Sequence, residues 1–494
     1  MAKLMPSSQA LTAGPTPLAG EGDFTDLMIG DEADSDFDAI EEDGSGPRAP
    51  EPAVDCSLQR DIALGRSISD CFDVDFLAHV PQALQAALRG RMTPCQISRI
   101  LPCLRSVSQG VLILLGFAGS GKTTFLALIM LMLVGAGKTI SVTSPTNVAA
   151  SNIARRTGSL DTNERLLIRV FTAYIEIYTV LRYDPRQPHA WKDTPTGRWY
   201  GHNHWEPKYS IAEWMLKLVG FLPTTNQKII GLRDGHGEII KILRTLPEER
   251  TDDDLSVSRI LIRRAMRDIC EKADIIFSTT TRSWDVPLVR KFTKNSDVVG
   301  LEEAGCAVPS ELYIPWRGNK YLLMAGDPNQ LPPTCLSEKV SVGGRNVNPL
   351  AENQTYSPLT RLKELGFPCI VLSEQLRMVP GGFDLAEAII YSGWNVTISS
   401  VFTNHILAPA LEMYALSLHD SIEPSLHAHL WPVHINIRGS RCVTGPTESK
   451  SNGRSARYTI RLVREMLTRV AGLSQDDIVI ITPYRDQGLA WTYL

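Results

Sequence analysis

The segment Gly116-Phe-Ala-Gly119-Ser120-Gly121-Lys122-Thr123 is the most informative part of the sequence, because it fits the phosphate-binding pattern G-x-x-x-x-G-K-[ST]. An apolar run of strand length, Val111–Leu115, leads directly into it, and a longer apolar run, Phe125–Val134, follows it. Glycines let backbone N–H groups turn inward around a phosphate, and a following helix points its positive end at the same charge. The sequence therefore predicts a buried strand, a phosphate-binding loop and a buried helix in succession.

The same pattern predicts which side chains serve a nucleoside triphosphate, which we take to be ATP. We expect Lys122 to reach the β- and γ-phosphates and the Thr123 hydroxyl to bind Mg²⁺. The residues expected to surround the phosphates are Gly116, Gly119, Ser120, Gly121, Lys122, Thr123 and Thr124. The alternative is a glycine-rich turn without a ligand, but the strand before it and the apolar run after it favour a P-loop NTPase, and hence an ATP hydrolase.

Further apolar runs predict that this strand belongs to a parallel sheet. The strand candidates after the loop are Thr139–Thr143, Ala273–Ser278, Val298–Leu301 and Tyr321–Ala325. Strands separated by helical stretches are typical of α/β domains, which bind ligands at the carboxyl ends of their strands. We therefore expect one α/β domain over residues 111–336, interrupted by an insertion at about 158–255 whose fold the sequence does not indicate.

Carboxylates and an amide follow two of these strands. A magnesium–nucleotide site needs a carboxylate at the end of a neighbouring strand, and Glu302 and Glu303 follow Val298–Leu301. We expect Glu302 to hold the metal through its water shell and Glu303 to activate or orient the attacking water. Gln330, after the next strand, is a candidate contact to the γ-phosphate or to that water. The alternatives are a solvated strand end for the glutamates and a plain turn for Gln330.

The length of 494 residues allows more than one core, and 43% hydrophobic with 21% charged residues is typical of a soluble globular protein. Residues 1–55 hold 13 acidic residues against Lys3 and Arg48, a local charge of −11, so the rest carries +7. We predict a disordered acidic tail there, either a solvating extension or an arm that binds a protein partner or inhibits the chain by mimicking nucleic acid.

The remaining boundaries follow from composition and periodicity. Residues 56–110 predict a helical lead-in, 337–358 a polar linker and 359–494 a second domain. The elements expected in the second domain are strands at Cys369–Leu372, Val433–Ile437 and Asp477–Thr482 and a helix at about 456–470. We expect a monomer.

The nine cysteines are scattered and never spaced as Cys-x-x-Cys, which argues against a disulfide framework or a zinc site and for a reducing compartment. The first residues lack the apolar segment of a signal peptide. The longest apolar run, Phe125–Val134, is much shorter than the ~20 residues of a membrane span. We therefore expect an intracellular protein without membrane contact, in the nucleus or the cytoplasm.

The chain resembles superfamily 1 helicases of the 5′-to-3′ group (group B) that contains the nonsense-mediated-decay RNA helicase and senataxin. The segments that carry the resemblance occur in the family's order over residues 90–494: Met92–Gln96, Gly116–Thr123, Thr143–Ala150, Ala273–Thr280, Glu302–Ala304, Gly326–Pro333, Gln375–Met378 and Ile481–Gln487. The resemblance implies two RecA-like parallel-sheet domains, with ATP between them and single-stranded RNA or DNA running across both.

The resemblance also implies roles for residues outside the P-loop. Gln96 stands where the family reads adenine, and Arg377 stands where an arginine neutralises charge on the γ-phosphate. Gln375 and Tyr484 are further candidates for the nucleotide site, with packing as their alternative role. The residues implied to grip nucleic-acid phosphates are Thr146, Asn147, Thr279 and Thr280.

Two of the places where the sequence departs from the family bear on its function. Glu302 occupies a position that usually holds Asp, and the chain stops at Leu494, before two further motifs of the family. We therefore expect the second RecA-like domain to be incomplete. Two functions stay open: an ATP-dependent helicase or translocase moving on single-stranded RNA or DNA, and a nucleotide-binding regulatory or scaffold protein without unwinding activity.

Overall fold

The computed structural model describes residues 55–66, 72–187, 189, 207–245, 249–338, 340–398, 407–424, 432–445 and 448–492. The predicted acidic tail lies outside these residues, apart from Asp55. The chain divides into two compact units, the first ending at Ser373 and the second beginning at Glu374. Each unit is described by itself.

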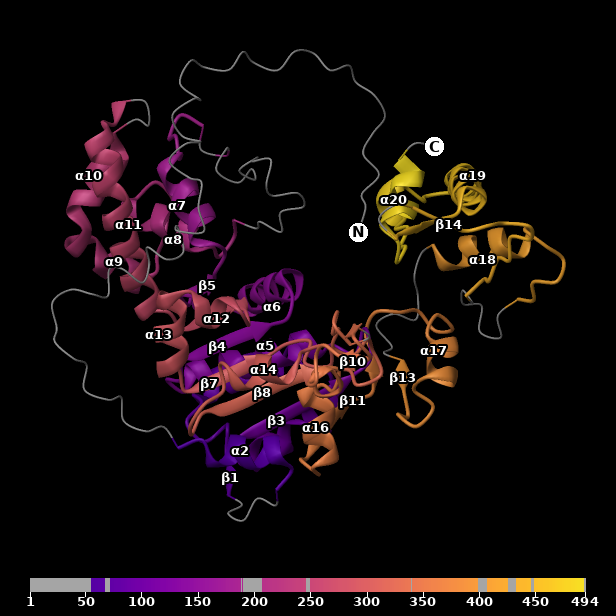
Figure 1. The fold of residues 1–494 in the computed structure, drawn as a ribbon, viewed down its shortest axis with the longest axis horizontal. Helices are drawn as coiled ribbons and strands as arrows, with labels where there is room; N and C mark the ends of the chain where they lie inside the picture. The colour runs from indigo at the N-terminus through magenta and orange to yellow at the C-terminus, as the bar shows by residue number, and fades with distance from the viewer. Residues whose placement is uncertain are drawn as a thin grey trace. The chain divides into compact units, whose positions relative to one another are not determined.

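The first unit is built on a seven-stranded parallel sheet with the strand order β11-β3-β8-β7-β4-β6-β5 (Figure 1). The strands are β3 (Val111–Gly116), β4 (Ile140–Ser144), β5 (Leu167–Arg169), β6 (Ile275–Thr279), β7 (Val298–Leu301), β8 (Tyr321–Gly326) and β11 (Cys369–Leu372). Every neighbouring pair in the sheet is parallel. The predicted α/β class and the four strand candidates after the P-loop are confirmed.

Helix α5 (Lys122–Gly135) follows β3 directly, as the apolar run predicts. Its residues Phe125–Leu133 are all buried, because the helix lies between the sheet and the surrounding helices, α3 (Gln82–Arg89) and α6 (Asn147–Leu160) among them. A helix that is apolar on every side belongs in a core. Its burial fixes the position of the loop that precedes it.

The lead-in over residues 56–110 contains helices together with one short strand pair. Its elements are α2 (Ser57–Leu64), β1 (Asp73–Val74), α3, α4 (Pro94–Arg99), a 3₁₀ turn at Leu101–Arg105 and β2 (Val107–Ser108), with β1 and β2 antiparallel. No helix in the described ranges is long and apolar enough to cross a membrane.

The region predicted as an insertion contains one strand of the main sheet. β5 pairs with β6 in parallel and forms an edge of the sheet, which the sequence did not indicate because the strand is three residues long. The helices that follow β5 build a second core with it: α7 (Ala173–Leu181), α8 (Ile211–Val219), α9 (Gln227–Leu232), α10 (Gly237–Arg244) and α11 (Asp252–Glu271). Residues 190–206, with their Trp and His side chains, lie outside the described ranges.

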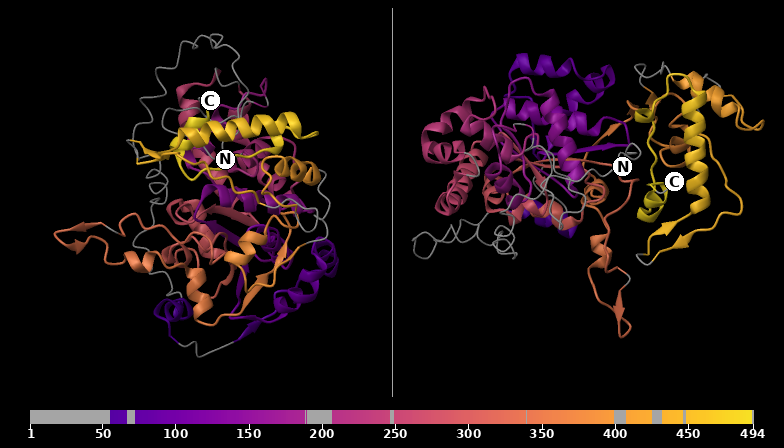
Figure 2. Two further views of the ribbon diagram at one scale, coloured as in Figure 1. Left: turned by 90° about the vertical axis from the view of Figure 1, so that its right-hand side faces the viewer. Right: turned by 90° about the horizontal axis from the view of Figure 1, so that it is seen from above.

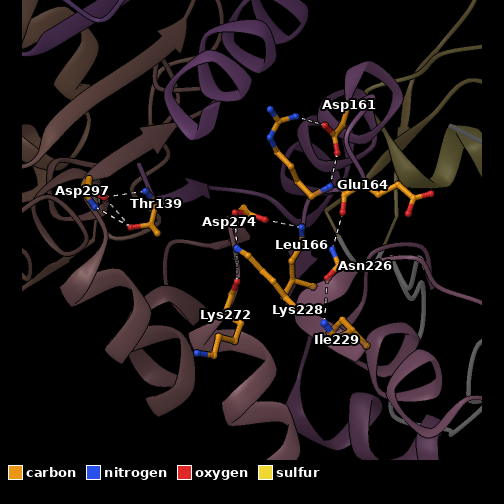
Figure 3. A network of polar contacts seen from close by, with 11 residues as sticks. Thr139, Asp161, Glu164, Leu166, Asn226, Lys228, Ile229, Lys272, Asp274 and Asp297 are labelled. Atoms are coloured by element: carbon orange, nitrogen blue, oxygen red, sulfur yellow. Dashed lines mark hydrogen bonds and ion pairs between the residues drawn. The ribbon is translucent and has the colours of Figure 1, made fainter. Parts of the chain in front are cut away.

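Polar contacts join these helices to the sheet, as Figure 3 shows. Lys228 Nζ donates to Asp274 Oδ1 at 2.7 Å, and Asp274 Oδ2 accepts the Leu166 N–H at 2.8 Å. Asn226 Nδ2 donates to the Glu164 carbonyl at 2.7 Å. Helix α9 is thereby tied to the segments that enter β5 and β6.

Strand β11 corrects the predicted domain boundary. Cys369–Leu372 was expected in the second domain, but it pairs in parallel with β3, with Cys369 opposite Ile113 and Leu372 opposite Gly116. The sequence identified the strand but not its sheet, because an apolar run carries no information about its pairing partner. The predicted linker before it contains a hairpin of β9 (Ser341–Val342) and β10 (Arg345–Asn346) and the start of a helical stretch, α15 (Ala351–Gln354) and α16 (Pro358–Glu364).

The described part of the second unit contains four α-helices and two short strand pairs. It contains α17 (Asp384–Ile389), α18 (Ala408–Leu416), α19 (Gly453–Arg469) and α20 (Arg485–Thr492), with strand pairs β12–β13 (Glu374–Gln375, Thr397–Ile398) and β14–β15 (Val443–Thr444, Lys450–Ser451), as Figures 1 and 2 show. The helix predicted at 456–470 is confirmed as α19.

The strand candidates Val433–Ile437 and Asp477–Thr482 are wrong for the described chain, where neither segment forms a strand. A strand needs a neighbour for its N–H and C=O groups, and no described segment of the unit pairs with either candidate. The apolar side chains of Val479 and Ile481 are consequently 61% and 83% exposed.

Candidate nucleotide-binding site

The phosphate-binding loop connects β3 to α5 at the carboxyl end of the sheet. Gly119 and Gly121 have φ values of 92° and 85°, in the left-handed region that favours glycine. At Gly116 a β-carbon would lie 2.2 Å from Ser120 Oγ, so the loop closes on itself only with glycine there. The Ser120 hydroxyl is buried and has no hydrogen-bond partner among the described residues. The loop therefore has the glycine positions and an available hydroxyl for a phosphate.

Lys122 lies over the loop that it terminates. Its Nζ donates to the Gly116 carbonyl at 2.7 Å and to the Phe117 carbonyl at 3.2 Å. These carbonyls belong to the first turn of the loop, so the ammonium group stands at the place where the predicted phosphates would enter. The role assigned to Lys122 requires only that phosphate oxygens replace the carbonyls as its acceptors.

Thr123 and Glu302 come together from distant parts of the sequence. Thr123 Oγ1 donates to Glu302 Oε1 at 2.5 Å, and Glu302 is 3% exposed. Burial raises the pKa of Glu302 to about 7, the Thr123 hydrogen bond opposes this, and the charge of Glu303 adds to it. Glu302 Oε2 is buried without a hydrogen-bond partner among the described residues. A hydroxyl beside an unsatisfied carboxylate oxygen is a donor set that suits Mg²⁺, which prefers oxygen ligands.

The expectation that Glu302 ends a neighbouring strand needs a correction. β8 lies between β3 and β7, so the glutamate is on the second strand from the P-loop. Its side chain nevertheless reaches Thr123 at the start of α5. Glu302 is one methylene longer than the Asp that is usual in the family, and with this length its carboxylate contacts the Thr123 hydroxyl.

Glu303 differs from Glu302 in burial and in backbone conformation. It is partly exposed, and its φ of 58° is in the left-handed region, which is uncommon for a residue with a side chain. Strained backbone of this kind costs of order 1–3 kcal/mol and occurs often at functional sites. The two glutamates thus occupy different environments, one buried beside Thr123 and one at the surface of the same turn.

The turns after β7 and β8 pack backbone against backbone. The Ala304 N–H donates to the Ala325 carbonyl at 2.9 Å. A β-carbon at Gly305 would lie 2.4 Å from the Asp327 carbonyl oxygen, and one at Gly326 would lie 2.8 Å from the Gly305 nitrogen. Gly305 was not among the predicted site residues. The one signal in the sequence was a glycine directly after the Glu302–Ala304 segment, which is compatible with a tight turn.

Replacing Gly305 with alanine tests this close approach. We expect Gly305→Ala to lower the free energy of unfolding by about 1–3 kcal/mol, because the methyl group meets a backbone atom that cannot rotate away. Urea denaturation measures the change. Gly231→Ala is the matched control, since a β-carbon there meets nothing within 4 Å. Equal stability of the two variants would contradict the packing described here.

Gln330 is held in the turn after β8. Its Nε2 donates to Asp327 Oδ2 at 3.0 Å, and Asp327 Oδ1 accepts the Asn329 N–H at 3.0 Å. Asp327 is buried, and its carboxylate holds the turn through these two hydrogen bonds. The contact of Gln330 with a γ-phosphate or a water stays a prediction, and Asp327 is a supporting residue that the sequence did not single out.

The pKa of Glu302 predicts a pH effect on stability. Its pKa of about 7 in the folded chain is above the usual 4.5, so its contribution to stability is fully present below pH ~4.5 and is lost as the pH rises through ~7. We expect the melting temperature of the chain without nucleotide to fall relative to Glu302→Gln across this interval. A pH-independent difference between the two proteins would contradict a buried, raised Glu302.

Gln96, the predicted adenine contact, is buried on α4. Its Oε1 accepts the Thr93 N–H at 3.0 Å, while Thr93 Oγ1 accepts the Gln96 N–H at 3.2 Å. The two residues form a capping box that begins the helix. The amide oxygen of Gln96 therefore serves the helix, and its role towards adenine stays a prediction.

The segments predicted to contact nucleic acid lie beside one another at the carboxyl ends of β4 and β6. Ser144 is the register partner of Thr279, and the Thr280 N–H donates to the Ser144 carbonyl at 3.2 Å. Thr146 is exposed and caps α6, where its Oγ1 accepts the Ala149 N–H at 3.2 Å. Thr279 is partly exposed, whereas Thr280 is buried. The parallel sheet thus brings the two predicted segments together.

The predicted residues of the second unit have local roles there. Gln375 is buried, and its Oε1 accepts the N–H groups of Arg377 at 2.9 Å and Met378 at 3.3 Å. Arg377 is exposed. Tyr484 is 40% exposed, with Lys450 Nζ 5.7 Å from its ring centre. Gln375 therefore shapes the turn that carries Arg377, and the roles of Arg377 and Tyr484 at the nucleotide stay predictions of the resemblance.

Comparisons with known proteins cover the segments that form this site. Residues 99–183 and 241–338 each match a family described as an AAA domain. Helicase sen1 of Schizosaccharomyces pombe is 28% identical over 236 residues, which are 46% of this chain and 12% of that protein. Probable helicase MAGATAMA 3 of Arabidopsis thaliana is 34% identical over 113 residues, 23% of this chain and 13% of that protein.

DNA-binding protein SMUBP-2 of Mesocricetus auratus is 27% identical over 237 residues, 47% of this chain and 21% of that protein. The chain spans less than a quarter of the length of each of these relatives. The first family match contains the P-loop and the second contains Glu302, Glu303 and Gln330. These comparisons support the resemblance to superfamily 1 helicases of the senataxin group and a P-loop protein of helicase type.

Proposed function

We propose that this chain, which is similar to superfamily 1 helicases of the senataxin group, couples ATP hydrolysis to movement along single-stranded RNA or DNA. The contact between Thr123 and Glu302 carries the proposal. It joins the P-loop hydroxyl to a buried carboxylate that retains an unsatisfied oxygen. A structural carboxylate in a protein interior is normally satisfied, so this arrangement fits a site that binds a cation.

Each group of the site has a distinct part in the proposed hydrolysis. The loop amides and Lys122 bind and orient the phosphates, and Thr123 and Glu302 would hold Mg²⁺ directly or through water. When bound, the ion would supply positive charge against the phosphate oxygens. Glu303, partly exposed at the same turn, accepts a proton from the attacking water or orients it. Gln330 is positioned by Asp327 to contact the same water or the γ-phosphate.

The proposed nucleic-acid surface lies at the carboxyl ends of β4 and β6 and consists of the turns that follow these two strands. Its contacts come from hydroxyls, an amide and the N-terminus of α6, which grip phosphates rather than read bases. We therefore expect little sequence preference and binding of both RNA and DNA. The similar proteins, two of them named as helicases and one as a DNA-binding protein, support a nucleic-acid partner.

Strand displacement tests the helicase proposal. Labelled partial duplexes with either a 5′ or a 3′ single-stranded overhang are incubated with the chain, Mg²⁺ and ATP. We expect ATP-dependent displacement of the duplex with the 5′ overhang and none with Lys122→Ala. Displacement without ATP, or displacement that survives in the variant, would contradict the proposed coupling.

A second function is favoured by the exposed apolar residues of the second unit. Val479 and Ile481 lie in a segment that forms no strand, and the sheets of the described second unit are the two-stranded pairs β12–β13 and β14–β15, not the larger parallel sheet that movement by the family's mechanism uses. The alternative is a nucleotide-binding regulatory or scaffold protein. It predicts ATP binding at the same P-loop with no displacement of either duplex.

A further inference from the structure

A buried arginine lies beneath the first turn of α6. Arg169, the last residue of the edge strand β5, is 1% exposed. Its Nη2 donates to Asn147 Oδ1 at 2.7 Å, and its Nε donates to Ser151 Oγ at 3.2 Å. Asn147 and Ser151 are four residues apart and therefore share one face of the helix. A buried guanidinium group is costly unless it is paired, and here two of its partners are on this helix.

The contact fixes the orientation of the Asn147 amide. An arginine side chain has donors only, so the oxygen of the amide must face it. The two N–H groups of Asn147 Nδ2 then point away from Arg169. Asn147 is exposed, and its Nδ2 has no hydrogen-bond partner among the described residues. The buried arginine thus presents a pair of oriented donors at the surface of the predicted nucleic-acid segment.

The helices that follow β5 hold Arg169 in place. The Arg169 N–H donates to the Tyr209 carbonyl at 2.7 Å, just before α8. The ring of Phe171 lies 4.4 Å from the centre of the guanidinium group. Glu176, buried on α7, accepts the Phe171 N–H at 3.1 Å and the Ala212 N–H at 2.8 Å. The guanidinium group therefore contacts α6 and the Phe171 ring, while the backbone around Arg169 is tied to α7 and to the start of α8.

We propose that Arg169 is a positioning residue for single-stranded nucleic acid: it locks the Asn147 amide so that Nδ2 donates to a backbone phosphate oxygen of the bound strand. This inference rests on the proposed nucleic-acid function. It also assigns a function to the helices after β5, because α7 and α8 hold the strand end that carries Arg169, and Arg169 orients the Asn147 Nδ2 donor.

Two substitutions of Asn147 separate its two contacts. Asn147→Asp retains an acceptor for Arg169 but has no donor, and it places a negative charge towards the phosphate. Asn147→Ala removes both contacts. We expect Asn147→Asp to melt at the temperature of the unchanged chain or above it, and to bind a labelled oligouridylate at least as weakly as Asn147→Ala. Binding by Asn147→Asp equal to that of the unchanged chain would overturn the inference.

A double-mutant cycle tests the role of Arg169. We expect Arg169→Gln and Asn147→Ala each to weaken oligouridylate binding roughly fivefold to tenfold, and the double variant to bind no more weakly than Asn147→Ala, because both changes remove one contact. ATP affinity should stay within about twofold. Arg156→Gln, an equal charge change on the exposed face of α6, is the control and should have a smaller effect.

The outcomes separate this inference from the proposed function. If the unchanged chain fails to bind oligouridylate or its DNA equivalent, the nucleic-acid function fails and the inference fails with it. If the unchanged chain binds and the effects of Arg169→Gln and Asn147→Ala multiply, the inference alone is overturned. Should Arg169→Gln prove unfolded in thermal melting, the comparison of Asn147→Asp with Asn147→Ala decides the question.

Discussion

Lys122→Ala should lower ATP turnover by roughly 10²–10³, because it removes an ammonium group that lies over the loop, where phosphate charge would develop. The Nζ contacts with the Gly116 and Phe117 carbonyls show that the side chain lies over the loop. Steady-state phosphate release measures the effect. The fold should survive, since the alanine leaves α5 buried as before.

Lys138→Ala is the control for this first prediction. Lys138 is half-exposed and pairs with Asp297 at 3.4 Å, away from the P-loop. We expect it to retain turnover within about twofold, because surface ion pairs contribute little. Turnover by Lys122→Ala close to that of the unchanged chain would mean that the P-loop is not the site of hydrolysis.

Glu303→Gln should lower kcat by roughly 10²–10⁴ while ATP affinity changes little, because the amide cannot accept a proton from water. We assign proton transfer to Glu303 because the two glutamates differ in environment. Glu302 is buried beside Thr123, whereas Glu303 is partly exposed. Single-turnover kinetics measures the chemical step, and a fluorescent ATP analogue measures binding.

The control for Glu303→Gln is Glu164→Gln. Glu164 also has a positive φ, 48°, so the substitution changes charge at a backbone of the same kind in a turn before β5. We expect normal turnover from this variant. A loss of ATP binding by Glu303→Gln as large as its loss of turnover would assign Glu303 to binding rather than to proton transfer.

The nucleotide site was predictable from the sequence to the extent that its parts are local. Gly116–Thr123 specify the loop through glycines and flanking apolar runs, and Phe125–Leu133 could be recognised as a buried helix. That Glu302 would meet Thr123 followed from the rule that ligands gather at the carboxyl ends of parallel strands. The contact distance and the unsatisfied Glu302 oxygen required the structure.

What the sequence did not reveal depends on pairing between distant segments. β11 was placed in the wrong unit, and β5 was overlooked, because strand order is set by tertiary packing. Arg169 belongs to none of the motifs recognised in the sequence, yet it is buried against Asn147 of the Thr143–Ala150 segment. The approach of Gly305 to Asp327 is likewise invisible until two loops are seen together.

We propose that single-stranded nucleic acid stimulates ATP hydrolysis at the P-loop of this chain. The decisive measurement is ATP turnover of the 494-residue chain with Mg²⁺, with and without single-stranded RNA or DNA, with Lys122→Ala as the blank. We predict turnover that rises on addition of the strand and is abolished in the variant. ATP binding without turnover, unchanged by the strand, would contradict this claim.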